Sequence, residues 1–299
     1  MRVERGAPEA VADRVTPLPG RWLLALQAGV CLTLAARGWL TWRWDSPLRT
    51  LVWQEGWWTN LLNRGFGVSW NEFARHSEPT LTRTLEAIGI GLMICAIVPC
   101  LATRDSLRWT RWLLVPAGLV LALDAFARWV EVDWQFAMSI EHALQVFTPF
   151  ALLMILGRAK TRPTWILLTI AAISLTFVGH GLYALGFHAV PLNFQTMTMK
   201  LLGCEQETAL LFLRIVGWLD LVAVVGLWFP TTRRWALFYM IAWGAATALA
   251  RPLAYGSLDP WLAEMLVRTP HWLFPLLLFF GLSKNATGES RERLNPEPA

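Results

Sequence analysis

Charged residues are scarce in this chain, making up 16% of its 299 residues, while hydrophobic residues make up 55%. A soluble globular protein carries about 25% charged residues. This scarcity, together with several apolar runs close to the length of a bilayer crossing, excludes a soluble, disordered or collagen-like chain. Tyrosine is also scarce, with 3 residues against 19 tryptophans. The composition predicts an all-α integral membrane protein.

The four cysteines include no Cys-x-x-Cys pair, which excludes a disulfide scaffold and argues against thiol–disulfide exchange. His-x-x-His, His-Glu-x-x-His and EF-hand spacings are also missing, as are Ser-x-x-Lys, Gly-x-Ser-x-Gly and phosphate-cradling glycine loops. No motif therefore specifies a reaction or a metal.

Eight apolar runs bounded by charges, proline or glycine predict a bundle of transmembrane helices. They cover residues 21–42, 82–102, 112–130, 140–157, 164–185, 209–229, 235–251 and 270–283. The last run is short, since only His271 to Leu282 is uninterrupted, so seven spans are the alternative. The first run also has features of a signal peptide, with basic residues before it and small residues at its end.

Basic residues are unevenly distributed between the loops and predict the orientation. If the N-terminus is cytoplasmic, the inner segments hold 15 of the 26 Lys and Arg residues and seven acids, and the remainder holds 11 basic and 14 acidic residues. Short cytoplasmic loops are enriched in Lys and Arg. We therefore expect a bacterial-type inner membrane protein with both termini cytoplasmic. The net charge of +5 reflects this topology and does not call for a nucleic-acid partner.

The two halves of the chain resemble each other in four places and in the same order. Arg37-Gly38 matches His180-Gly181, the run from Leu85 matches the run from Leu213, and Ala127-Arg128 matches Ala250-Arg251; Pro149 to Gly157 matches Pro275 to Gly281. This predicts two parallel four-helix units, 21–160 and 161–284, between cytoplasmic tails 1–20 and 285–299. It also argues that the first run is retained as a helix.

The segment Phe212 to Leu221, which contains Gly217-Trp218-Leu219-Asp220, resembles the DoxX-like group of small bacterial membrane proteins. Leu85 to Gly91 is similar. The likeness covers about a quarter of the chain and departs where a Glu would often follow the Gly. The resemblance implies a paired four-helix bundle and an association with redox or quinone-linked complexes, and it supplies no catalytic residues.

Ionisable residues inside a bilayer are costly, so those that remain are paired, buried or functional. Here they gather at the predicted exoplasmic ends of the helices, which predicts a polar cavity open to that side. The candidates are Arg37, Glu86, Asp124, Arg128, Glu141, His142, His180, Arg214, Asp220, Arg251 and His271.

Several candidates have structural explanations. Asp124 and Arg128 are four residues apart and can neutralise each other. Arg37 and Arg251 are close enough to helix ends to snorkel, and Glu141 fits the first turn of a helix. Asp220 and Arg214 lie inside an apolar helix, so each requires a partner from another helix.

Three histidines, His142, His180 and His271, lie at helix ends on the same side. Two facing histidines would suit a b-type haem, and three with a carboxylate would suit a metal. Without a ligand motif, a hydrogen-bonded core histidine is the default for each, and the cofactor is left open.

Two long outer loops flank this side. Leu48 to Asn63 follows the N-cap pair Ser46-Pro47 and predicts an interfacial helix. Residues 186–208 either form a matching lid over the polar cavity or, like the first loop, only seal the bundle. Seven of the tryptophans lie between residues 39 and 70. They mark the first loop as an embedded or capping element.

These features favour a binding or accessory subunit for a quinone, lipid or redox partner. The first alternative is an enzyme that performs acid/base chemistry on a lipid-linked substrate, with Glu86, Glu141, His142, His180 and Arg214 as candidates. The second alternative is a transporter, which the parallel repeats support.

Overall fold

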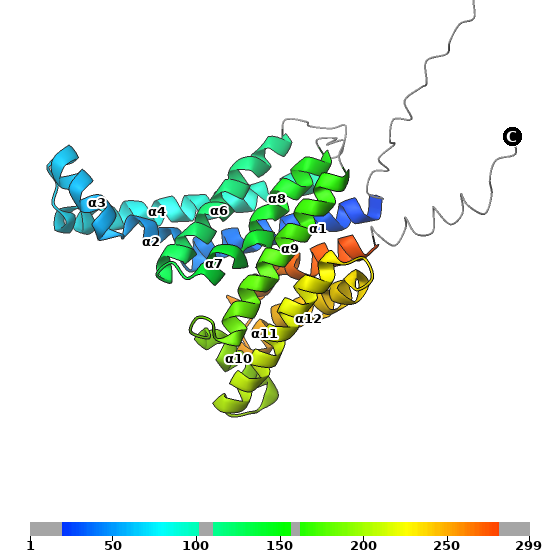
Figure 1. The fold of residues 1–299 in the computed structure, drawn as a ribbon. Coiled ribbons are helices and arrows are strands. Elements are labelled where there is room, and N and C mark those ends of the chain that lie inside the picture. The colour runs from blue at the N-terminus through cyan, green and yellow to red at the C-terminus, as the bar shows by residue number, and fades with distance from the viewer. Residues whose placement is uncertain (1–19, 102–109, 157–161, 281–299) are drawn as a thin grey trace, which may run out of the picture.

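The computed structural model describes residues 20–101, 110–156 and 162–280, and within these ranges the chain is helical with no strand (Figure 1). The predicted all-α bundle is confirmed. The α-helices, in chain order, are α1 (Gly20–Arg43), α2 (Leu48–Val52), α3 (Glu55–Leu61), α4 (Trp70–Cys95), α5 (Val98–Leu101), α6 (Leu114–Glu131), α7 (Phe136–Glu141), α8 (Ala143–Leu156), α9 (Arg162–Leu185), α10 (Leu192–Leu202), α11 (Gln206–Trp228), α12 (Arg233–Tyr255) and α13 (Trp261–Val267).

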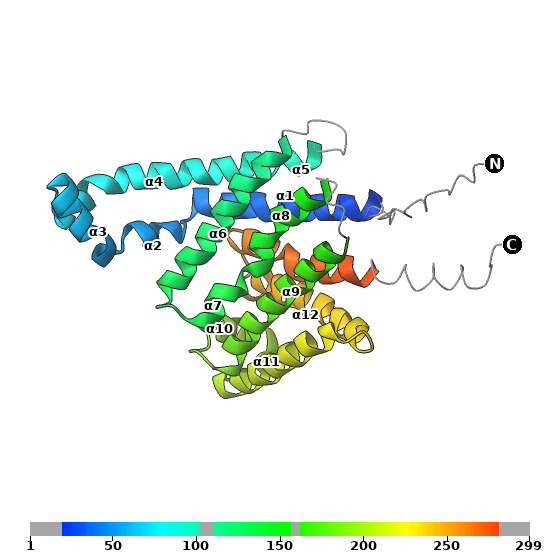
Figure 2. The same cartoon turned by 45° about the horizontal axis from the view of Figure 1, so that its top comes forward.

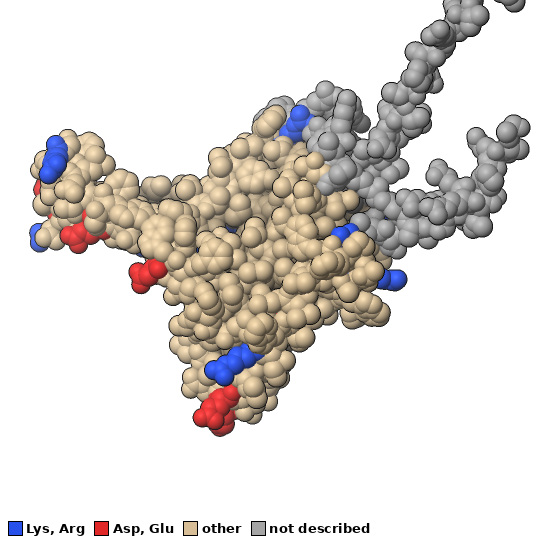
Figure 3. Space-filling model, in the orientation of Figure 1, with Lys and Arg blue, Asp and Glu red and all other residues tan. Residues whose placement is uncertain are grey.

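Seven helical segments are long and apolar enough to cross a bilayer. They are Gly20–Arg43, Trp70–Leu101, Arg111–Glu131, Phe136–Leu156, Thr164–Leu185, Gln206–Trp228 and Arg233–Tyr255. Their outward faces carry large apolar side chains, such as Ile215, Trp218 and Val222 on α11. Charged side chains on the face seen in Figure 3 lie mainly at its corners. The chain is a multi-pass integral membrane protein.

The eighth predicted run is helical over residues 269–280, and its predicted end at 281–283 lies outside the described residues. At its far end the ring of Phe280 stacks on Trp22 near the start of α1, with 4.9 Å between ring centroids. The described chain therefore begins and ends on the same side of the bundle.

The first long loop, which is predicted to face the exoplasmic side, differs from the predicted single interfacial helix. Two short helices, α2 and α3, and a π-helical turn over Leu62–Phe66 replace it, because the chain bends at Trp53 and the indole of Trp58 donates to the carbonyl of Leu51. The second spanning helix begins at Trp70 instead of 82, where Ser69 caps it by accepting from the Glu72 amide. These elements project from the bundle as an arm (Figure 2).

Two pairs of glycines allow two pairs of helices to pack with their backbones in contact. A Cβ on Gly38 of α1 would lie 2.6 Å from the carbonyl oxygen of Gly89 on α4. In the second half, a Cβ on Gly217 of α11 would lie 2.8 Å from the carbonyl oxygen of Gly181 on α9. Both crossings occur at positions that match in the sequence comparison of the halves.

The last two helices of each half are joined by the same one-residue break. His142 separates α7 from α8 with φ −94° and ψ 7°, and Arg268 separates α13 from the segment 269–280 with φ −91° and ψ 5°. The short helices pack across the halves, α7 on α9 and α13 on α1. Each half thus contributes a short helix to the outer end of the other.

The apolar core lies between these helices and is filled by buried aliphatic and aromatic side chains. Among the fully buried residues are Leu26, Leu34, Leu144, Leu152, Ile173, Leu227, Met240 and Phe274. This core supports the outer ends of the helices, where the polar residues gather.

Candidate functional site

A cluster of buried charges occupies the outer ends of the helices and begins at Asp124 on α6. Its Oδ2 lies 3.1 Å from Nε of Arg128, one turn along the same helix, and 3.6 Å from Nε of Arg37 on α1. Arg37 Nη2 also donates to Oε1 of Gln145 on α8 at 3.2 Å. Asp124 and Arg128 therefore pair as predicted. Arg37 is only 3% exposed and does not snorkel to the surface.

Glu264 of α13 links this cluster to two further arginines. Its Oε2 accepts from Arg268 Nη1 at 2.6 Å and lies 3.9 Å from Nε of Arg251, whose Nη1 donates to the carbonyl of Thr247. Arg251 is as buried as Arg37. We call the six residues Arg37, Asp124, Arg128, Arg251, Glu264 and Arg268 the buried charge cluster.

Four guanidiniums set the charge state of Glu264, which lies outside the seven spanning helices. Burial alone would raise its pKa, but the positive charges of Arg268, Arg37, Arg251 and Arg128 lower that pKa from the ordinary 4.5 to about 2. The carboxylate is therefore ionised at every physiological pH.

The low pKa of Glu264 predicts a specific acid sensitivity. Ionised Glu264 stabilises the fold, so its contribution is complete above about pH 4.5 and is lost as the pH falls toward 2. We expect the difference in thermal unfolding temperature between the wild type and Glu264→Gln to be constant from pH 7 to 5 and to shrink below 4.5. A difference that already shrinks between pH 7 and 6 would contradict this assignment.

A second polar group joins the two halves through α7 and α9. A Cβ on Gly179 would lie 2.8 Å from the backbone of Ala137 and Glu141, so glycine allows α7 to approach α9 closely. This contact brings Oε1 of Glu141 to 3.8 Å from Nδ1 of His180. The ring of His180 lies 5.3 Å from that of His271, centroid to centroid.

The two His271 ring nitrogens have different surroundings. Nδ1 lies 3.1 Å from the carbonyl oxygen of Arg268, and Nε2 is buried with no hydrogen-bond partner within the described residues. Gly244 of α12 positions this residue, because a Cβ there would lie 2.9 Å from the carbonyl oxygen of His271. Both ring nitrogens of His142 are likewise buried without a described partner. No group of three or more His, Cys, Asp or Glu side chains in the described ranges is arranged to hold a metal.

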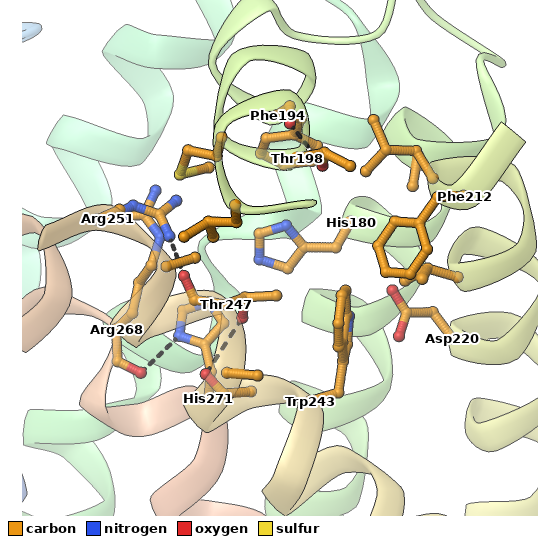
Figure 4. A pocket seen from close by; sticks show the side chains of 18 of the residues that line it. His180, Phe194, Thr198, Phe212, Asp220, Trp243, Thr247, Arg251, Arg268 and His271 are labelled. Atoms are coloured by element: carbon orange, nitrogen blue, oxygen red, sulfur yellow. Dashed lines mark hydrogen bonds between the residues drawn. The ribbon is translucent and has the colours of Figure 1, made fainter. Parts of the chain in front are cut away.

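A cavity of about 220 Å³ lies beside these groups, in the second half of the chain. It is bounded by α9, α10, α11, α12 and the start of 269–280, so α10 covers it as the predicted lid would. Figure 4 shows Arg251 at one end, Asp220 near the other, and His180 between them. Most of the wall is apolar and includes Phe177, Phe194, Met197, Phe212, Leu213, Val216 and Trp243.

Asp220 receives its hydrogen bond from another helix, as its position in the sequence predicted. The hydroxyl of Tyr239 on α12 donates to Oδ1 of Asp220 at 2.8 Å. Asp220 is 1% exposed and lines the cavity. Asp220 contributes a carboxyl group to an end of the cavity that is otherwise lined by aromatic and aliphatic side chains.

The first half carries a different hollow at the corresponding place. A polar cleft of about 560 Å³ lies between α2 and the outer end of α6 and is lined by Asp45, Arg49, Arg128 and Glu131 among others. Arg128 faces this cleft, and Arg251, its counterpart in the second half, faces the apolar cavity. The two arginines that match in the sequence comparison therefore lie beside hollows of opposite character.

The structure brings together most of the predicted polar residues and leaves two outside. Glu86 on α4 and Arg214 on α11 are exposed on the outer surface of their helices and line neither hollow. Sequence reasoning missed Glu264 and Arg268, because both lie between the predicted spans 235–251 and 270–283. The signal was available, since Glu264 and Arg268 are four residues apart and lie where α7 and His142 lie in the first half.

No protein-family model, curated protein or solved structure matches this chain, so the function of the site is argued from its geometry.

Proposed function

We propose that this membrane protein binds one amphiphilic molecule, a lipid or a quinone, in the cavity between α9, α10, α11 and α12. The observation that carries the proposal is the cavity itself, which is apolar along most of its wall and has buried polar groups at its ends. Ligand pockets characteristically combine an apolar wall with a few convergent polar groups. In a membrane, a molecule with a tail and a polar head fits this arrangement.

The proposal is tested by filling the cavity from one wall. Ala250 lines the cavity on α12, and Ala242, on the same helix, is exposed and does not line it. We expect Ala250→Phe to remove a co-purifying lipid or quinone from the native mass spectrum, and to lower affinity for added ligand by about tenfold or more. Ala242→Phe should retain the wild-type spectrum. Equal ligand occupancy in both variants would refute binding in this cavity.

An enzyme acting on a lipid-linked substrate is the second candidate, and one observation favours it. The carboxyl of Asp220 and the imidazole of His180 line the same cavity, so a bound molecule would meet both an acid and a base. Glu86 and Arg214 are too exposed to take part, which leaves Glu141, His142 and His180 from the earlier set. Asp220→Asn that retains ligand but loses turnover would favour catalysis over binding alone.

We also infer that the chain crosses the membrane eight times, with both ends on the cytoplasmic side of a bacterial-type inner membrane. The contact between Trp22 and Phe280 supports an even number of crossings. The matched glycine crossings and the matched breaks at His142 and Arg268 support a tandem duplication of a four-helix unit. The DoxX-like resemblance agrees with such a unit and is part of this proposal.

A further inference from the structure

We infer that the amphiphile carries an anionic head, a carboxylate or a phosphate monoester, which binds between Arg251 and Arg268 with its tail toward Trp243 and Phe212. This inference rests on the proposed function, because it assigns the chemistry of a ligand in that cavity. Both arginines line the cavity, and their side chains are 4% and 12% exposed.

The first reason is that the two guanidiniums share one carboxylate oxygen. Oε2 of Glu264 is 2.6 Å from Nη1 of Arg268 but 3.9 Å from Nε of Arg251. Arg251 therefore has no close charged hydrogen bond to Glu264, and within the described residues its short hydrogen bond goes to the neutral carbonyl of Thr247 at 2.6 Å. A guanidinium carries five N–H donors in a planar fork suited to carboxylate and phosphate oxygens.

The second reason is the balance of charge around this end of the cavity. Arg251 and Arg268 are the two arginines that line this end of the cavity, and within the described residues Glu264 is the carboxylate that lies within 4 Å of both guanidiniums. Asp220 lies at the far end of the cavity and takes its hydrogen bond from Tyr239. Two positive charges thus share one negative charge here, and an anionic head beside Arg251 would supply the second.

The third reason is a polar atom that lacks a partner at the same end. His271 lines the cavity, is 3% exposed, and its Nε2 is buried without a hydrogen bond within the described chain. If its Nδ1 donates to the carbonyl of Arg268, the neutral ring presents Nε2 as an acceptor. The O–H of a phosphate monoester monoanion supplies the matching donor and keeps the negative charge.

The size of the cavity limits the tail. Pockets that enclose drug-sized ligands measure about 300–1,000 Å³. At about 220 Å³ this cavity holds a head and part of one chain, and a whole two-chain phospholipid does not fit. A single-chain anionic amphiphile is therefore the class of probe chosen to test the inference.

The inference is tested with full-length protein purified in a neutral maltoside detergent, by scintillation proximity with labelled tetradecanoate. Tetradecanol, tetradecyl phosphate and inorganic phosphate serve as competitors. We expect both anionic amphiphiles to bind at least about tenfold more tightly than tetradecanol, because their head groups would accept charge-assisted hydrogen bonds from the arginines. Arg251→Gln should remove this preference, Arg251→Lys should keep part of it, and Arg214→Gln, which alters an exposed arginine, should not change it.

The possible failures separate the two proposals. If tetradecanol binds as tightly as tetradecanoate in the wild type and Ala250→Phe abolishes both, the cavity binds amphiphiles and the anionic head is refuted. If inorganic phosphate displaces tetradecanoate as well as tetradecyl phosphate does, the anion site stands and the role of the tail is refuted. If no probe binds above the detergent background, both proposals fail. The wild-type comparison decides the head chemistry even if Arg251→Gln does not fold.

Discussion

Replacing Gly89 by valine should prevent stable folding, while the same replacement at Gly91 should leave the protein close to wild type. A Cβ on Gly89 would lie 2.6 Å from the backbone nitrogen of Trp42 and 2.7 Å from the carbonyl oxygen of Gly38. These are backbone atoms of α1, so a side chain can be accommodated only if the two helices separate. Overpacking a tight core costs about 1–3 kcal/mol even where the neighbouring side chains can move aside. The atoms that face Gly89 are backbone atoms, which cannot move aside in this way.

Gly91 is a matched control, because it lies two residues away on α4 and a Cβ there would have no atom within 4 Å. Valine is a better helix former than glycine, so helix propensity does not explain a loss of stability in the Gly89 variant. The measurement is the yield of monodisperse protein and its thermal unfolding temperature in detergent. Gly217→Val should repeat the Gly89 result in the second half. Equal unfolding temperatures for the Gly89 and Gly91 variants would refute the close crossing.

Glu264→Gln should destabilise the protein by about 3–5 kcal/mol at pH 7, the usual cost of removing one partner of a buried ion pair. Glutamine keeps the shape and can still accept a hydrogen bond from Arg268, so the change isolates the charge. The substitution leaves Arg251 and Arg268 without the Glu264 carboxylate, which lies within 4 Å of both guanidiniums.

Glu86→Gln makes the same chemical change on the exposed surface of α4 and should be nearly neutral. Adding Arg268→Met to Glu264→Gln should recover part of the lost stability, because it also removes an uncompensated positive charge. The measurement is chemical unfolding in detergent monitored by near-UV circular dichroism. If Glu264→Gln and Glu86→Gln are equally stable, Glu264 does not hold the cluster together.

The spanning helices could be predicted from sequence because long apolar runs have few alternatives in a bilayer. The start of α4 could not be, since Trp70 to Leu81 contains charges and Pro79 and resembles a loop. In the structure Ser69 caps this helix, which begins 12 residues before the predicted span.

The orientation of single ionisable residues was harder to predict than the helices. Arg214 and Asp220 lie on the same apolar helix, six residues apart, so they point in different directions. The sequence does not indicate which direction faces the bundle, because α11 is apolar on every side. Packing decides which face of α11 is buried. Gly217 faces α9, and as a result Asp220 points into the bundle and Arg214 points away from it.

The location of Glu264 near the end of the chain has a consequence for biogenesis. This residue follows Arg37 by 227 positions and Arg128 by 136 positions. At synthesis rates of about 5–20 residues per second, Arg37 waits roughly 10–45 s for it after leaving the ribosome. Until then Asp124 is the carboxylate nearest both arginines, so the early helices must keep their outer ends in contact with water. Glu264 reaches Arg251 and Arg268 only when α13 has been synthesised, which makes the late packing of that short helix the step that completes the ion pairs of the buried charge cluster.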